Sequence, residues 1–231
     1  YTARYTHETV ALAFAITEEA IEDNLYDRLS ARYTKALARS MSNAKQVKAI
    51  EPLINGLPST ATFKSGDGVS LFNKDHTTVS GPNVANTLQT QADLNETSLE
   101  QSMIDIAKMT DERGLRIAAR GLKMIIPSEL QFTAERLMKS QGRTGTADND
   151  INAIVSMGMV PQGYRVNNYL TDSDAFYILT DIPNGMKMFT RAPLTTAMEG
   201  DFDTGNVRYK ARERYSFGVS DFRGIFGVEG A

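Results

Sequence analysis

The sequence predicts an α+β fold in which one very long helix packs on one very long strand. A helical pattern of apolar residues runs through residues 17–56, and apolar and polar residues alternate over 207–219. Between them, the order strand, Pro-Ser, helix at 123–140 indicates a compact mixed α/β segment. We therefore expect a helix-and-sheet layer joined to a second, mixed region.

Composition limits the function classes. The chain has 231 residues, a net charge of −3 and no cysteine. This length allows one large or two smaller domains. Charges of both signs are mixed, so nothing marks the chain as a general nucleic-acid or membrane-surface binder. The lack of cysteine excludes disulfides, thiolate metal sites and a cysteine nucleophile. No apolar run reaches the roughly 18 residues that cross a bilayer, and we expect no membrane partner.

The first element is a predicted strand within 1–16, rich in Thr, Tyr and Val, which leads into the helical region. Thr17 is the expected N-cap, Asn55-Gly56 predicts a left-handed terminator, and Pro58 prevents continuation. The pattern fits one helix or a short helix followed by a long one. We expect an arc of roughly 160° to be buried: Leu25, Tyr26, Leu29, Tyr33, Ala36, Leu37, Ser40, Met41, Ala44 and Val47.

The predicted helix is unusually long. Some 38 helical residues would span about 57 Å, which exceeds the width of most domains and suits an elongated molecule. A basic stripe lies away from the apolar arc, and we interpret it as a solvated face: Arg28, Arg32, Lys35 and Arg39.

The middle of the chain predicts alternating short elements. Residues 58–82 indicate a loop with a short strand or turn, and 97–109 a helix with Asn95 or Thr97 as cap and Gly114 at its end. A buried strand at 123–127 precedes a helix over 128–140. A polar loop at 141–152 follows, then strands at 164–170 and 175–180. From Gly185 onward the pattern is all-β.

The alternating segment 207–219 predicts a strand of about 40 Å with two different faces. One face is apolar except for Glu213, and the other is basic. If the long helix covers the apolar face, the two form a thin, extended layer. The basic face carries Arg208, Lys210, Arg212, Arg214 and Ser216.

The basic face has three interpretations: it contacts phosphate, pairs with acidic groups of another subunit, or is solvated. Subunit pairing is favoured because adjacent cations repel one another and an acidic cluster is available as counter-charge. The candidate subunit-interface residues are therefore Glu18, Glu19, Glu22, Asp23, Arg208, Lys210, Arg212 and Arg214.

No convincing active site is present. His7 and His76 are far apart and have no ligand spacing. Asp75 beside His76 would suit acid/base chemistry in a small soluble hydrolase, but without a nucleophile motif a structural histidine is the favoured interpretation. Asp172 and Asp174 indicate a turn, and Asp201–Asn206 a hairpin turn. We predict no catalytic residue, cofactor or metal.

Several segments, in order, resemble the major capsid proteins of tailed bacteriophages with the fold of phage Hong Kong ninety-seven. The likeness is closest to the Mu-type head subunit branch. The segments are ITEEAIEDN, LINGLPS, DGVSLFNKDHTTVSGPNVANTL, KMIIPSELQFTAERLM, YLTDSDAFYILTD and RYKARERYSFGVSDFRGIFG, which together extend from about Ile16 to Gly227.

The resemblance implies a peripheral domain over 1–60 and 186–219, built from the first strand, the spine helix and an elongated antiparallel sheet. It implies a mixed α/β axial domain over 61–185 and 220–231. The family's amino-terminal arm and extended loop would precede Tyr1. The implied function is self-assembly into hexamers and pentamers of an icosahedral virion shell, around double-stranded DNA bound without sequence specificity. Scaffold, portal and decoration proteins are expected partners, and an encapsulin-like compartment is the alternative.

Overall fold

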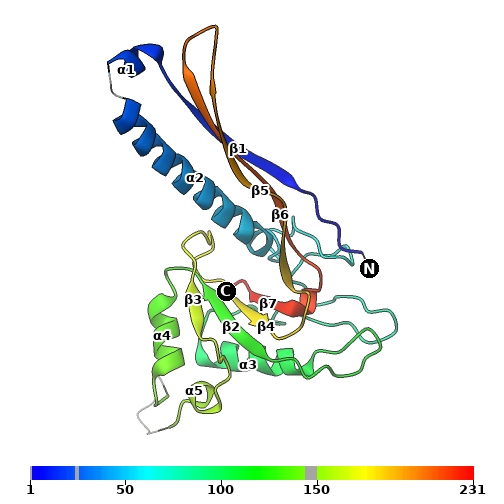
Figure 1. Cartoon of the computed structure of the whole chain (residues 1–231). Helices are drawn as coiled ribbons and strands as arrows, with labels where there is room; N and C mark the ends of the chain where they lie inside the picture. The colour runs from blue at the N-terminus through cyan, green and yellow to red at the C-terminus, as the bar shows by residue number, and fades with distance from the viewer. Residues whose placement is uncertain (1, 24–25, 144–149) are drawn as a thin grey trace. The chain divides into compact units, whose positions relative to one another are not determined.

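The computed structural model describes the chain except residues 1, 24–25 and 144–149 (Figure 1). The chain forms two compact units. Unit 1 comprises residues 1–4, 50–187 and 219–231, and unit 2 comprises residues 5–49 and 188–218. In the described residues, no helix is both long and apolar enough to span a bilayer.

Unit 2 contains a three-stranded sheet and a long helix. The sheet order is β1-β6-β5, with β1 at Glu8–Ile16, β5 at Met186–Gly200 and β6 at Val207–Val219. The short helix α1, Glu18–Glu22, precedes α2, Tyr26–Ile54. Thr17 accepts a hydrogen bond from Ala20 N, which confirms the predicted cap. The two-helix alternative is therefore correct.

The apolar face of β6 packs on α2, as the alternation predicts. Leu37 and Met41 of the helix form a core cluster with Ala211, and the rings of Phe14 and Tyr209 stack with their centroids 4.9 Å apart. Phe14 and Tyr209 also face each other across the antiparallel β1–β6 ladder. The long helix and the long strand thus bury a shared surface.

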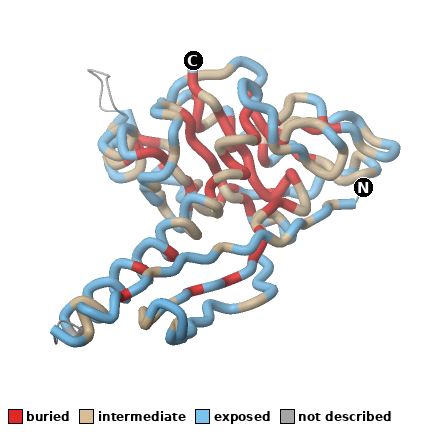
Figure 2. Tube along the Cα trace, turned by 90° about the horizontal axis from the view of Figure 1, so that it is seen from above, coloured by how far each residue is buried: buried red, intermediate tan, exposed pale blue. Residues whose placement is uncertain are grey.

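The predicted buried arc of α2 is too wide. Among the arc residues whose side chains are described, only Leu37 and Met41 are buried, whereas Tyr33 and Val47 are each more than two-fifths exposed. Leu25 and the side chain of Tyr26 lie outside the described residues. Figure 2 shows how few buried positions α2 and β5 contain. Helical periodicity identifies the apolar side of a helix, but not how much of it the same chain covers.

The predicted left-handed terminator is also wrong. The helix ends at Ile54, and neither Asn55 nor Gly56 has a positive φ. Gly56 is needed for close packing instead, because a Cβ there would lie 2.6 Å from the Pro52 carbonyl oxygen and 2.7 Å from Leu71 Cβ.

Unit 1 is built on a four-stranded sheet of order β3-β2-β4-β7, with β2 at Gly121–Ile126, β3 at Tyr164–Val166, β4 at Phe176–Thr180 and β7 at Ile225–Val228. β2 and β3 are parallel and the other pairs antiparallel. The crossover between β2 and β3 carries α4, Gln131–Lys139, and α5, Ala153–Met157. The helix α3, Glu96–Lys108, and the short 3-10 helix η1, Phe222–Gly224, complete the unit.

Several boundaries in unit 1 differ from the predictions. β3 ends at Val166, because Asn167 Oδ1 accepts from Tyr169 N and turns the chain. α3 begins at the predicted cap, Asn95, but ends before Met109, which is extended. Gly114 instead lies in a hairpin, with φ +88°. The sequence did not predict α5, and half of the loop predicted at 141–152 lies outside the described residues.

Candidate functional site

The four predicted basic residues share the open face of the unit 2 sheet. All four are exposed, and they alternate with residues of β6 that face α2. Their partners across the β1 ladder are small: Thr9, Ala11, Ala13 and Ala15 stand opposite Arg214, Arg212, Lys210 and Arg208. Because these β1 side chains are short, the cationic side chains of β6 project beyond them on this face of the sheet.

The four predicted acidic residues are also exposed and lie on or beside α1. The helix is close to the β5–β6 hairpin turn, since a Cβ on Gly205 would collide with the Glu18 carboxylate. In the described residues Arg208 pairs with Asp201, while no ion pair joins the acidic set to the basic set. Lys210, Arg212 and Arg214 are thus available to another molecule.

Glu213, the exception on the apolar face, is explained by an ion pair. Its carboxylate is buried beneath α2 and lies 3.0 Å from Lys45 Nζ. The Lys45 ammonium also lies 5.2 Å from the centre of the Tyr215 ring. A buried carboxylate requires a partner, so this pair fixes the position of α2 on the sheet.

We expect Lys45→Ala to destabilise unit 2 by about 1–2 kcal/mol, because it leaves the Glu213 carboxylate buried without a counter-ion. This value is below that of a fully buried pair, since the Lys45 side chain is about one-third exposed. The double variant Lys45→Met/Glu213→Leu should recover most of the loss. Urea denaturation of unassembled protein measures the free energy of unfolding of both variants. If the single and double variants lose equal stability, the uncompensated Glu213 charge is not the cause of the loss.

His76, the one histidine considered for catalysis, is fully buried in unit 1. Its Nδ1 lies 2.6 Å from Asp67 Oδ2, and its Nε2 lies 3.1 Å from Asn86 Oδ1 and 3.2 Å from the Leu71 carbonyl. The ring stacks on Phe222 at 3.8 Å. Every polar atom of this histidine is therefore occupied within the fold.

The alternative that paired Asp75 with His76 for acid/base chemistry is wrong. Asp75 is exposed, and it lines a surface hollow of about 590 Å³ that His76 does not reach. Asp67, nine residues earlier, is the carboxylate beside the ring. Ser65 donates to Asp67 and not to the histidine, so the group has no activated nucleophile. The structural interpretation of His76 is correct.

The pKa of Asp67 is lowered from its usual value. Burial opposes ionisation, but hydrogen bonds from Ser65 and His76, the histidine charge and a bond from Val69 N outweigh it. A carboxyl whose pKa is lower folded than unfolded stabilises the fold above the unfolded pKa, near 4, and this contribution disappears as the pH falls through the folded value.

We therefore expect unit 1 to lose stability below about pH 4, and Asp67→Asn to reduce this acid sensitivity while lowering stability at pH 7. Urea denaturation between pH 3 and pH 7 measures both effects. Asp75→Asn, at the exposed neighbouring carboxylate, is the control and should change neither. If Asp67→Asn loses as much stability below pH 4 as the unsubstituted protein, Asp67 is not the source of the acid sensitivity.

Two further buried polar residues escaped the sequence analysis. Asn86 Nδ2 donates to the carbonyls of Leu71, Phe222 and Ile225, at 2.7, 3.1 and 3.3 Å. Arg223 donates to Thr110 O and to the Glu112 carboxylate, both at 2.8 Å. No local motif marks either residue, because their partners are distant in sequence.

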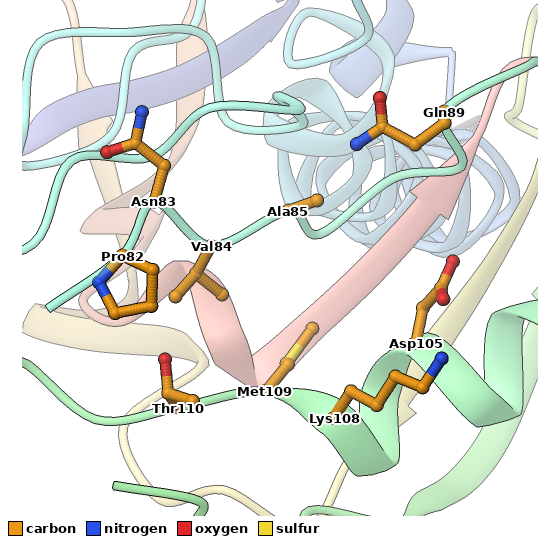
Figure 3. A pocket seen from close by; sticks show the side chains of 9 residues that line it. All are labelled: Pro82, Asn83, Val84, Ala85, Gln89, Asp105, Lys108, Met109 and Thr110. Carbon is orange, nitrogen blue, oxygen red and sulfur yellow. The ribbon is translucent and has the colours of Figure 1, made fainter. Parts of the chain in front are cut away.

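Figure 3 shows a cavity of about 210 Å³ between the 82–89 loop and the end of α3. Asp105 and Lys108 supply its only charges, and no histidine lines it. This volume is below the usual range for ligand sites. In the described part of the chain, no cluster of His, Asp and Glu is arranged to hold a metal. The cavity residues are Pro82, Asn83, Val84, Ala85, Gln89, Asp105, Lys108, Met109 and Thr110.

Comparisons with known proteins agree with an assembly role. The family described as phage capsid protein matches residues 1–228. No curated protein matches the chain. Among solved structures, the capsid of Myoviridae phage XM1 has a TM-score of 0.58 at 13% identity, covering 98% of this chain and 74% of that one. Mycobacterium phage Patience gives 0.62 at 11% identity, with 98% and 70% covered.

A virus-like particle from Pyrococcus furiosus has the same fold, with a TM-score of 0.51 at 12% identity and coverage of 96% and 76%. These likenesses establish the α+β fold of phage Hong Kong ninety-seven, with its long helix and antiparallel strands. The family match covers nearly the whole chain. The chain belongs to the phage capsid protein family: it is a major capsid protein, a structural component of the icosahedral head shell of the virion and not an enzyme.

Proposed function

We propose that the chain forms hexamers and pentamers that close into the head of a tailed phage around double-stranded DNA. The family match over residues 1–228 is the observation that carries this proposal. Repeated modest contacts give a closed shell its strength, so no single contact needs to be tight. We also propose that the chain belongs to the Mu-type head subunit branch, and the order of the resembling segments supports this.

The domain assignment belongs to the same proposal. Residues 1–60 and 186–219 form the peripheral domain, and residues 61–185 and 220–231 form the axial domain. The division of the chain into unit 2 and unit 1, near residues 50, 188 and 219, supports boundaries close to these. Scaffold, portal and decoration proteins would complete the particle as partners.

The proposed subunit interface joins the acidic residues around α1 to the open basic face of β6 in a neighbouring copy. Exposure of all eight side chains supports it, as does the lack of an ion pair between the two sets in the described residues. Complementary charge also guides subunits into one orientation and disfavours others.

An encapsulin-like compartment with protein cargo is the second candidate, and the likeness to the Pyrococcus furiosus particle favours it. Particles purified from cells that express the whole phage gene set distinguish the two. We expect nuclease-resistant double-stranded DNA inside them and a portal at one vertex. Particles that hold protein cargo and no protected DNA would support the compartment instead.

A further inference from the structure

The long helix α2 carries cations and almost no carboxylates. Residues 28–50 include six Lys or Arg residues and no Asp or Glu. Two of these cations, Lys45 and Lys48, pair with Glu213 of β6 and Glu8 of β1. The other four are exposed, and within the described residues no ion pair engages them. They form the α2 stripe: Arg28, Arg32, Lys35 and Arg39.

The α2 stripe lies opposite the side of the helix that packs on the sheet. At about 100° per residue, its four members fall within roughly 60° of arc, centred about 170° from the side that carries Leu37 and Met41. Those two side chains pack on Ala211 of β6. Figure 1 shows α2 along one face of the sheet, and among the described residues of unit 2 no element covers its other side. The stripe is therefore an open line of positive charge.

The neutral residues on the same side of α2 are also of types that bind phosphate. Ser42, Asn43 and Gln46 continue this side beyond the stripe, and all three are exposed. Hydroxyl and amide side chains hydrogen-bond to phosphate oxygens, as Arg and Lys side chains do. Over residues 28–46, the outer third of the helix thus contains only Arg, Lys, Ser, Asn and Gln.

A purely solvated helix face usually places acidic residues three or four positions from its cations. In the α2 stripe every neighbour at this spacing is another cation, and like charges at this spacing repel one another. Binding of a polyanion relieves the repulsion. The stripe spans roughly 16 Å of helix, and double-stranded DNA carries one negative charge per about 1.7 Å of its axis. The length of the stripe therefore suits an extended polyanion better than a single phosphate group.

We propose that the α2 stripe contacts the phosphates of the double-stranded DNA enclosed by the shell. An acidic internal protein is the competing occupant. DNA is favoured because a protein–protein interface has an apolar core, and this side of the helix offers no apolar side chain for one. The contact neutralises charge and does not distinguish bases, so it is independent of sequence. The inference rests on the proposed function and names the surface that faces the packaged DNA.

Photo-crosslinking in filled heads tests which face of unit 2 meets the DNA. Full-length protein carries the photo-reactive residue azidophenylalanine in place of Ser42 or, separately, of Gln46, and is produced with the whole phage gene set. After irradiation of nuclease-treated particles, we expect at least one of the two positions to attach to packaged DNA. The matched control places the same residue at the exposed Thr9, which lies opposite Arg214 on the open face of the sheet, and should attach to protein only.

The outcomes separate this contact from the proposed function. Filled particles in which neither α2 position attaches to DNA, or in which Thr9 attaches equally well, overturn the contact and leave the proposed function intact. Attachment of the α2 positions to an internal protein and not to DNA also overturns it. Particles that contain no nuclease-resistant DNA contradict both proposals.

Binding of a short DNA duplex to the unassembled full-length protein measures the contribution of the charges and does not depend on assembly. The triple variant Arg32→Gln/Lys35→Gln/Arg39→Gln should weaken binding at least tenfold at low salt. It should also reduce the slope of log K against log salt concentration by about 0.9 for each cation removed. Unchanged affinity and slope would overturn the contact.

The matched control for the triple variant is Arg113→Gln/Arg116→Gln/Arg120→Gln, which makes the same change in net charge at exposed positions of unit 1. Carboxylates lie close to these arginines: Asp111 accepts from Arg113 N, and Asp181 accepts from Arg120 N. We therefore expect the control to change the salt slope by less than the loss of one phosphate contact. Equal effects of the two triple variants would overturn the proposal, because binding would then follow net charge and not the α2 stripe.

Discussion

Asn86→Asp should destabilise unit 1 by roughly 3–5 kcal/mol, because it removes a donor from three backbone carbonyls and buries a negative charge beside their oxygens. The Asn86 side chain is fully buried, and its Nδ2 faces three backbone carbonyls from two separate parts of the chain. The substitution replaces this donor with an acceptor of the same size and adds a negative charge. One carboxylate oxygen would keep the acceptor position 3.1 Å from His76 Nε2, but the other would face three carbonyl oxygens, and the neutral form restores at most one donor.

Asn86→Ala should cost less, about 2–3 kcal/mol, because it leaves unsatisfied acceptors without adding a charge. The control is Asn83→Asp, the same chemical change at an exposed position three residues earlier, which should be nearly neutral. Urea denaturation of unassembled protein ranks the three variants. Equal stability of Asn86→Asp and Asn83→Asp would show that Asn86 does not join the 71–86 loop to η1 and β7.

Arg212→Glu should abolish assembly while the monomer remains folded. The Arg212 side chain is exposed on the open face of β6, so its reversal removes no buried contact within the chain. Against an acidic partner surface the change replaces attraction with repulsion, which costs several kcal/mol at each repeated interface. Each 1.4 kcal/mol lowers the association constant tenfold.

The control for Arg212→Glu is Arg32→Glu, which makes the same charge change on the exposed stripe of α2. It should assemble normally. Glu22→Arg alone should impair assembly, and combining it with Arg212→Glu should restore part of it if the two side chains meet across the interface. Sedimentation and negative-stain microscopy report the assembled fraction. Normal assembly of Arg212→Glu would show that the proposed charge-paired interface does not form.

Features that depend only on residues close together in the sequence were predicted correctly. The alternation of β6, the cap at Thr17 and the cap at Asn95 depend on neighbours within a few residues, and the structure confirms them. The partner of His76 depends on how the 57–90 loop folds, so the adjacent Asp75 was a misleading guide and Asp67 was missed. The same reason hides Asn86 and Arg223, whose bonds reach over a hundred residues along the chain.

The over-wide buried arc of α2 is informative in another way. Tyr33 and Val47 follow the apolar periodicity but are exposed in the single chain. A protein that assembles with copies of itself has apolar residues for those contacts as well as for its own core. Periodicity in the sequence does not distinguish the two kinds of burial, and the structure of one chain describes only burial within that chain.

Electron microscopy of the purified full-length protein is the most direct test of a subunit that works through its repeated contacts. We expect closed icosahedral shells whose reconstruction resolves five-fold and six-fold rings of this chain. A folded protein that remains monomeric at every concentration tested, and under conditions that assemble other capsid proteins, would contradict the account.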